Sequence, residues 1–208
     1  MMDTIQLPHG LVHGELSVEE AIATRRSERD FSRQPMSLDE LSHVLHYSSG
    51  ITERRYRLRA APSAGATYPI EIYPVVNNVE GLARGIYHYV ILSHELEKLR
   101  EGDFRQEMAQ ASLRQSMVSE ANVALVLSAV FQRTRRRYRE RAQRYIVLET
   151  GHIAQNIYLV ATSLGLGSCA IGAFHDEDFN LLLGLDGKEE SVIYIMVVGK
   201  IRKEQALV

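Results

Sequence analysis

The sequence predicts an α+β protein, in which helices precede and separate the strands instead of alternating with them regularly. Two nearly continuous apolar runs of strand length, residues 123–131 and 192–201, indicate strands buried on both faces. The third observation is a long helix from about Tyr145, whose steps of four and three keep one face in register: Ile146, Thr150, Ile153, Ile157, Val160 and Leu164. Its other faces are also largely apolar, so we expect this helix to be buried, in part against a second subunit.

Length and composition are those of one globular domain, expected to span residues 1–208. The chain is 45% hydrophobic and 24% charged with a formal net charge of -2, so nothing global indicates a nucleic acid or a membrane as partner. Its first residues lack the basic-then-apolar build of a signal peptide, and we therefore expect a cytoplasmic protein. The single cysteine, Cys169, excludes an internal disulfide, and no Cys/His cluster has zinc spacing, so no metal is expected.

The first half of the chain begins with two predicted helices. Each starts with a capping box, in which a serine is followed three residues later by a glutamate: Ser17 with Glu20, and Ser37 with Glu40, the second helix running to about Tyr47. The polar, basic residues 48–59 predict a loop. Small residues between two prolines follow in residues 61–69, which lets the backbone approach a flat ligand, although a simple turn is the alternative.

The middle of the chain contains two predicted strands, residues 70–76 and 85–90. Pro74 lacks an N–H, so we expect the second half of the first strand to be an edge or a bulge. Helix-favouring residues between Glu95 and Ser112 predict a helix there.

After the long helix, Gly165 is expected to turn left-handed, and residues 168–174 have few polar side chains. Such a run offers a ligand mainly backbone N–H and C=O groups, although glycines that merely end a helix are the alternative. Residues 176–183 predict a short helix ended by Gly184, before the last strand.

A candidate anion site follows the first helix. Arg25, Arg26 and Arg29 surround Ser27, and three guanidinium groups with a hydroxyl can surround a phosphate. The alternative is a solvated, charged helix end, because arginine is favourable near a helix C-terminus.

Two other features allow more specific functional interpretations, which the sequence supports less well. Seven arginines in residues 133–144, around Tyr138, could bind RNA or an acidic peptide, but the net negative charge favours a solvated helix entry, with an anionic ligand next. Glu149 and His152 have the Glu-x-x-His spacing of di-iron proteins, which need two copies and further carboxylates. Only one copy is present, so a hydrogen bond on the helix face or a core histidine is the better interpretation.

Taken together, these motifs resemble those of the nitroreductase superfamily of flavoproteins, and within it the SagB-type dehydrogenases, which include oxidases that form azoles in ribosomal peptides. The resemblance covers about residues 17–202. It rests on Arg25-Arg26-Ser27-Glu28-Arg29, Pro62-Ser63-Ala64-Gly65-Ala66-Thr67-Tyr68-Pro69, Gly85-Ile86-Tyr87-His88-Tyr89, residues 138–145, residues 149–156, Leu164-Gly165-Leu166-Gly167 and Ile171-Gly172-Ala173-Phe174. Each motif is weak alone, whereas their order and spacing are specific.

The resemblance implies a nitroreductase-like fold with a central, mostly antiparallel sheet, and a homodimer that binds FMN at its interface, beside the long helix. It implies that the phosphate and ribityl chain are held by Arg25, Arg26, Ser27 and Arg29, with Lys200 or Arg202 from the C-terminal end. It places Pro62, Ser63, Ala64 and Gly65 of the partner subunit against the flavin ring. It further implies that Gln115 reaches the polar edge of the ring, and that the N–H of Gly172, flanked by Ile171 and Ala173, faces flavin N5.

The resemblance implies hydride transfer between flavin N5 and a small-molecule or peptide-heterocycle substrate, with Tyr138 and Gly172 as catalytic groups. Azoline oxidases of this type carry a Lys-Tyr pair before the long helix, where this chain has Arg137 and Tyr138. Arginine stays protonated near neutral pH and is a poor general base, which puts azole formation in doubt. Two alternatives follow. One is a reductase of nitro compounds or quinones that takes hydride from NAD(P)H, and the other is a non-catalytic protein whose arginine cluster binds a nucleic acid or an acidic peptide.

Overall fold

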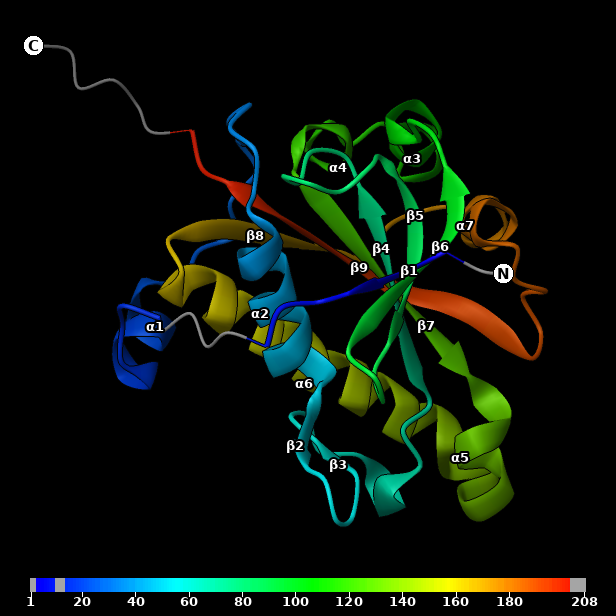
Figure 1. Cartoon of the computed structure of the whole chain (residues 1–208). Coiled ribbons are helices and arrows are strands. Elements are labelled where there is room, and N and C mark those ends of the chain that lie inside the picture. The colour runs from blue at the N-terminus through cyan, green and yellow to red at the C-terminus, as the bar shows by residue number, and fades with distance from the viewer. Residues whose placement is uncertain (1–2, 10–13, 203–208) are drawn as a thin grey trace, which may run out of the picture.

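A seven-stranded sheet forms the centre of the computed structural model, which describes residues 3–9 and 14–202 (Figure 1). All neighbouring strands pair antiparallel, in the order β1-β6-β5-β4-β7-β9-β8. The strands are β1 Thr4–Gln6, β4 Ile70–Val76, β5 Gly85–Val90, β6 Glu95–Glu101, β7 Val123–Val130, β8 Leu166–Ile171 and β9 Glu190–Lys200. β7 lies inside the sheet between β4 and β9, and nearly all of its residues are buried, as the continuous apolar run predicted.

Helices cover both faces of the sheet, which confirms the α+β class and the antiparallel sheet. Helices α2 and α6 pack on one face, and α3, α4 and α7 pack on the other, each face with its own hydrophobic core. The helices are α1 Val18–Thr24, α2 Leu38–Ser49, α3 Arg105–Ala111, α4 Met117–Glu120, α5 Phe131–Tyr138, α6 Ala142–Ser163 and α7 Asp176–Leu183, with short 3-10 turns η1 Ala64–Ala66 and η2 Arg139–Arg141. None of the helices in the described ranges is long and apolar enough to cross a bilayer.

Local signals placed several of these elements correctly. Both predicted capping boxes are present at the starts of α1 and α2, each serine side chain accepting from the third helical N–H. Gly165 and Gly184 have the expected left-handed backbone, with φ of 68° and 73°, and end α6 and α7.

Three predictions were wrong. Residues 95–101 form strand β6 instead of a helix, because pairing with β1 and β5 and the burial of Leu96 outweigh the helix preference of Glu, Lys and Leu. The expected loop 48–59 contains a hairpin, β2 Ile51–Glu53 with β3 Leu58–Arg59. Pro74 produces neither an edge nor a bulge, since β4 pairs with β7 throughout and pairing with β5 starts just beyond it, at Val75.

Helix α6 is buried along one face only. Ile146, Ile153 and Ile157 are at most 1% exposed and belong to the core that it shares with α2 and the sheet. Val147 and Leu148, which point away from this core, are 52% and 53% exposed. Within the single chain α6 therefore keeps a partly apolar face available for another surface, and its burial against a second subunit stays a prediction.

Candidate active site

The arginine-rich segment after α1 lies beside strand β8. Ser27 forms an isolated parallel bridge with Ser168, and the N–H of Glu28 donates to Ser168 O at 2.9 Å. Sequence-distant residues 27 and 168 are thus joined by backbone hydrogen bonds. The buried hydroxyl of Ser168 has no hydrogen-bond partner among the described residues, which marks this edge as a place where a polar group is missing.

Tyr158, on the last turns of α6, contacts both β8 and the arginine-rich segment. Its hydroxyl accepts from the N–H of Ala170 at 2.7 Å and lies 3.1 Å from the hydroxyl of Ser27. The guanidinium of Arg25 stacks over the Tyr158 ring, 4.9 Å from its centroid. Nothing in the sequence distinguishes Tyr158 from other helix tyrosines, so this role could not be predicted.

The other cations predicted to hold a phosphate have protein partners. Arg26 donates to the carbonyl oxygens of Ala23 at 3.1 Å and Arg25 at 2.7 Å, and Arg29 donates to Ser27 O at 3.2 Å. Arg26 and Arg29 are both exposed. Their remaining N–H donors can still face an anion, since each arginine has five.

Lys200 and Arg202 pair with carboxylates. The ammonium of Lys200 forms a salt bridge with Glu40 at the start of α2. Arg202 pairs with Asp30 at 3.2 Å and donates to Phe31 O at 3.2 Å. Either side chain would have to exchange its carboxylate for a ligand phosphate, so Arg25 is the better placed of these three cations.

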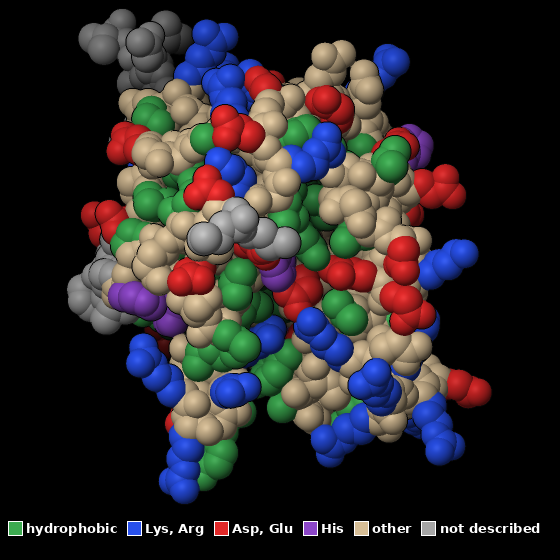
Figure 2. Space-filling model, turned by 45° about the vertical axis from the view of Figure 1, so that its right-hand side comes forward, with side chains coloured by type: hydrophobic (Ala, Val, Ile, Leu, Met, Phe, Trp, Pro, Cys, Tyr) green, Lys and Arg blue, Asp and Glu red, His purple; other side chains and the backbone are tan. Residues whose placement is uncertain are grey.

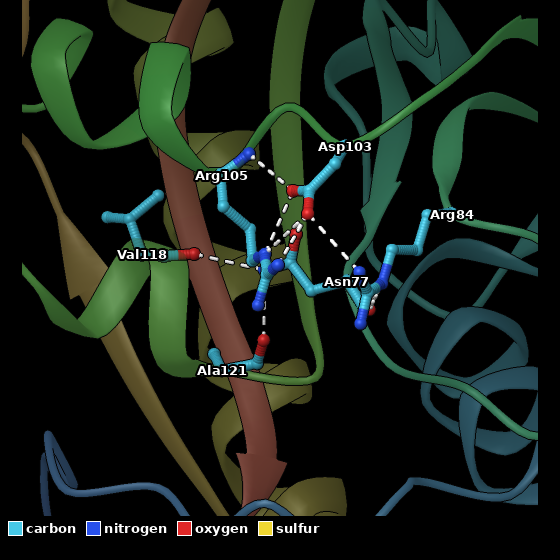
Figure 3. Close-up of polar contacts among 6 residues, drawn as sticks. All are labelled: Asn77, Arg84, Asp103, Arg105, Val118 and Ala121. Carbon is cyan, nitrogen blue, oxygen red and sulfur yellow. Dashed lines mark hydrogen bonds and ion pairs between the residues drawn. The ribbon is translucent and has the colours of Figure 1, made fainter.

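A polar cavity of about 1050 Å³, which Arg202 also borders, lies over α3 and α4. Two of its arginines, Arg84 and Arg105, share one carboxylate partner, Asp103, through contacts of 3.2 Å and 2.8 Å (Figure 3). The hydrogen bond from Arg105, together with the positive charges, lowers the pKa of Asp103 to about 2. Buried Asn77 donates to Val118 O at 3.2 Å and Ala121 O at 2.9 Å, so it braces the α4 region. The side chains of Arg84, Arg105, Asp103 and Asn77 thus bind other groups of the protein, which makes this region structural.

The end of strand β8 exposes its backbone. Ile171 is buried, whereas Gly172 and Ala173 are exposed. A Cβ at Gly172 would make only an ordinary contact of 3.5 Å with Tyr194, and the backbone there is not left-handed. The chain itself therefore does not require glycine at this position, and the free surface suits a flat ligand lying against main chain.

Gln115 points at this strand end. Its amide donates to Ala173 O at 3.0 Å and to Ser112 O at 2.9 Å, which leaves its carbonyl oxygen to accept from a ligand N–H. Leu113 and Arg114 just before it have left-handed backbones, with φ of 55° and 60°. Such conformations cost on the order of 1 kcal/mol each and cluster at functional sites.

The small-residue turn lies at the other end of α6. Pro62 and Gly65 are exposed, and Ser63 Oγ accepts from the N–H of Tyr68 at 2.9 Å. Ala66 and Tyr68 again have positive φ, 53° and 44°. This turn is therefore both strained and accessible, as a segment that contacts a partner or ligand would be.

Tyr138 lies against this turn. Its hydroxyl is 2.6 Å from the place a Cβ on residue 65 would occupy, so Gly65 allows close approach, and its φ of 60° favours glycine as well. Arg137 donates to Gly65 O at 3.1 Å, and the rings of Tyr138 and Tyr145 lie 4.7 Å apart. Arg139 follows with a left-handed φ of 49°.

Glu149 is a buried carboxyl group behind the turn. It is 4% exposed, and burial raises its pKa to about 7, opposed by its hydrogen bond with Ser63 and by the charge of Arg59. His152, in contrast, is exposed. From the sequence, Glu149 was predicted to form a hydrogen bond on the helix face, in preference to half of a metal motif. Its spacing from Ile146 and Ile153, three and four residues, was the signal that it lies on the buried face.

These groups form two separate half-sites within the single chain. Arg25, Ser27 and the end of β8 contact the C-terminal end of α6 through Tyr158, and the turn contacts its N-terminal half through Glu149. Nine residues of helix separate Glu149 from Tyr158, about 14 Å at 1.5 Å per residue.

Comparison with known proteins accords with this geometry. The nitroreductase family profile matches residues 22–200. MJ1384, a proposed nitroreductase of Methanocaldococcus jannaschii, is 39% identical over 186 residues, which cover 89% of this chain and 92% of MJ1384. The microcin B17-processing protein McbC of Escherichia coli is 29% identical over 154 residues, which cover 72% of this chain and 57% of McbC.

Solved structures share the fold. A proposed nitroreductase from Ralstonia eutropha superimposes with a TM-score of 0.83 at 25% identity, covering 96% of this chain and 90% of that one. The NADPH:FMN oxidoreductase of Vibrio harveyi, solved with NAD+, gives a TM-score of 0.66 at 22% identity, covering 89% of this chain and 69% of that one.

The fold and these similarities define an enzyme of the oxidoreductase class. The chain belongs to the nitroreductase family. This class contradicts the third hypothesis from the sequence, a non-catalytic protein whose arginine cluster binds a nucleic acid or an acidic peptide.

Proposed function

We propose that this oxidoreductase binds FMN and transfers hydride between flavin N5 and a small-molecule or peptide-heterocycle substrate, as a SagB-type dehydrogenase. The observation that carries the proposal is the bridge between Ser27 and Ser168, which aligns the arginine segment with β8. Four residues of strand separate Ser168 from Gly172, about 13 Å, so a phosphate beside Ser27 and a flat ring beside Gly172 can belong to one extended ligand.

The residues present fit FMN. Arg25 and Ser27 supply a charged donor and a hydroxyl for the phosphate, with Arg26, Arg29, Lys200 and Arg202 around them. The exposed backbone of Gly172 and Ala173, beside buried Ile171, leaves room for a ring whose N5 would accept from the N–H of Gly172. The carbonyl oxygen of Gln115 can accept from the imide N–H at the ring's polar edge.

Bound FMN would supply the hydride chemistry, and this chain's residues would bind and orient it. The N–H of Gly172 would stabilise charge at N5, and Arg25 would neutralise the phosphate. Tyr138 is the candidate to hold or move a proton of the substrate. Arg137 is held on the carbonyl of Gly65, so it acts here by positioning the turn.

A homodimer would complete the site. The two half-sites lie at opposite ends of α6, so Pro62, Ser63, Ala64 and Gly65 would cover the flavin bound by the partner subunit rather than that of their own chain. The exposed apolar residues Val147 and Leu148 supply a face of α6 that a second copy can bury. Similarity to McbC, a peptide-processing protein, favours a peptide-heterocycle substrate.

The proposal is tested by the visible absorption spectrum of the purified protein, recorded anaerobically while NADH and then NADPH are added. We expect flavin bands that survive desalting and persist with either nucleotide, since a dehydrogenase is reduced by its own substrate. Fast bleaching would favour the second candidate, an NAD(P)H-dependent nitro or quinone reductase, which the similarity to MJ1384 also supports. A protein without flavin bands, even after incubation with FMN, would contradict both.

A further inference from the structure

A cavity of about 520 Å³ opens behind the small-residue turn. It lies between the β2–β3 hairpin, the turn itself and the first turn of α5, in the lower part of Figure 2, where Lys and Arg side chains gather. Its charged and aromatic lining includes Arg57, Arg59, Arg133, Tyr56, Tyr68 and His88. Neither the flavin site nor the hydride chemistry proposed above uses this cavity.

Only one arginine of the lining has a carboxylate partner. Arg133 forms a salt bridge with Glu71, the only acidic residue of the lining, and Glu71 also binds His88 Nε2 at 2.8 Å. Within residues 3–9 and 14–202, no carboxylate lies within ion-pair distance of Arg57 or Arg59. Three arginines against one glutamate therefore leave two positive charges uncompensated.

Arg59 is the less exposed of the two. Its guanidinium stacks on the Tyr68 ring at 4.5 Å, and burial lowers its pKa despite the carboxylates of Glu71 and Glu149 farther off. A charge taken out of water without a partner is costly, and a stacked guanidinium keeps its in-plane donors free. The larger cavity over α3 and α4 differs, since Arg84 and Arg105 there each have a carboxylate, Asp103, within ion-pair distance.

We propose that this cavity is an anion-binding subsite, in which Arg59, assisted by Arg57, binds a carboxylate or phosphate group. Arginine matches both groups through paired N–H donors. The small-residue turn connects the cavity with the proposed dimer interface. Ala66, Thr67 and Tyr68 line the cavity, while Pro62 and Gly65 of the same turn are exposed. The subsite would hold the anionic end of the compound that reacts at the partner's flavin. This last step rests on the proposed function, whereas anion binding does not.

Calorimetric titration of the FMN-loaded protein with inorganic pyrophosphate, and separately with citrate, tests the proposal. We expect Arg59→Met to weaken binding about tenfold or more, because charge-assisted hydrogen bonds are lost. Arg55→Met is the matched control, since Arg55 lies on the same hairpin, stacks on Tyr56 and does not line the cavity. Preference for pyrophosphate would indicate a phosphate-bearing ligand such as a nucleotide, and preference for citrate a carboxylate-bearing substrate.

Two results would overturn the proposal. One is equal binding of the anion by the wild type and Arg59→Met, and the other is no binding by the wild type at anion concentrations up to about 10 mM, where weak sites fill. Arg57→Met serves as the second variant, because Arg57 is exposed and its loss should leave folding intact; we expect a smaller loss in the same direction. Flavin absorbance is recorded in parallel. Binding that depends on Arg59 in a protein without flavin would leave the subsite standing while the proposed function failed.

Discussion

The two ends of helix α6 are built differently. At the C-terminal end, the hydroxyl of Tyr158 satisfies the N–H of Ala170 and lies beside Ser27, and the segments meet through regular backbone bonds. At the N-terminal end, the turn holds Ala66 and Tyr68 in left-handed conformations, in front of a buried carboxyl group, Glu149. The first end is suited to holding a ligand in a fixed place. The N-terminal end has a strained turn and a carboxyl group, Glu149, whose pKa is raised. Both are features of segments that take part in binding or chemistry.

The largest expected effect concerns Glu149. Its pKa is raised from 4.5 to about 7, so the native state keeps the proton while the unfolded chain loses it. The stabilising contribution of this proton is complete below about pH 4.5 and is lost as the pH rises to about 7, up to about 3 kcal/mol. Urea unfolding of the wild type and Glu149→Gln between pH 4.5 and 8 should show the wild type losing stability relative to the variant as the pH rises. A constant difference would mean that Glu149 does not titrate in this window.

At the other end of α6, Arg25→Met should weaken FMN binding by about tenfold to a hundredfold, because a charge-assisted hydrogen bond to the phosphate is lost. Arg26→Met is the control: its guanidinium is already bound to the carbonyl oxygens of Ala23 and Arg25, so we expect a much smaller effect. Quenching of FMN fluorescence measures both. If the two variants bind alike, Arg25 is not the principal phosphate ligand.

Tyr158→Phe should lower the free energy of unfolding by about 1–2 kcal/mol, because the N–H of Ala170 and the hydroxyl of Ser27 lose their shared partner. Chemical denaturation at pH 6 measures the change. Because Tyr158 lies at the other end of α6, we expect Tyr158→Phe to leave the pH dependence of the free energy of unfolding that Glu149 causes unchanged. A variant as stable as the wild type would show that this hydroxyl is not needed to hold the edge of β8.

The smallest effect is expected for Ala66→Gly, which should stabilise the protein by up to about 1 kcal/mol by relieving the left-handed backbone. Ala64→Gly in the same turn, where φ is not positive, should instead destabilise it slightly. Thermal unfolding of the pair separates strain from the general flexibility that glycine adds. Opposite signs would confirm that Ala66 is strained.

Local patterns predicted much of the fold. The capping boxes of α1 and α2, the buried strand β7 and the glycine ends of α6 and α7 each depend on residues close in sequence. Strand β6 did not follow its local preference, because its partners β1 and β5 are separate segments. The candidate residues Arg25, Ser27 and Gly172 could be named from motifs. The structure brings Gln115 to Ala173 through a hydrogen bond, and its approach to a flavin ring stays a prediction.

What the sequence determined by itself was most of the long elements and the chemistry of their ends, because caps, turns and periodicity act over a few residues. Tertiary structure alone decided which charges meet. Lys200 and Arg202 have carboxylate partners in Glu40 and Asp30, while no described carboxylate pairs with Arg57 or Arg59. It also decided that Glu149 is buried behind Ser63 and that the two half-sites lie at opposite ends of α6. Burial and charge pairing depend on segments far apart in the chain, whose approach no local pattern records.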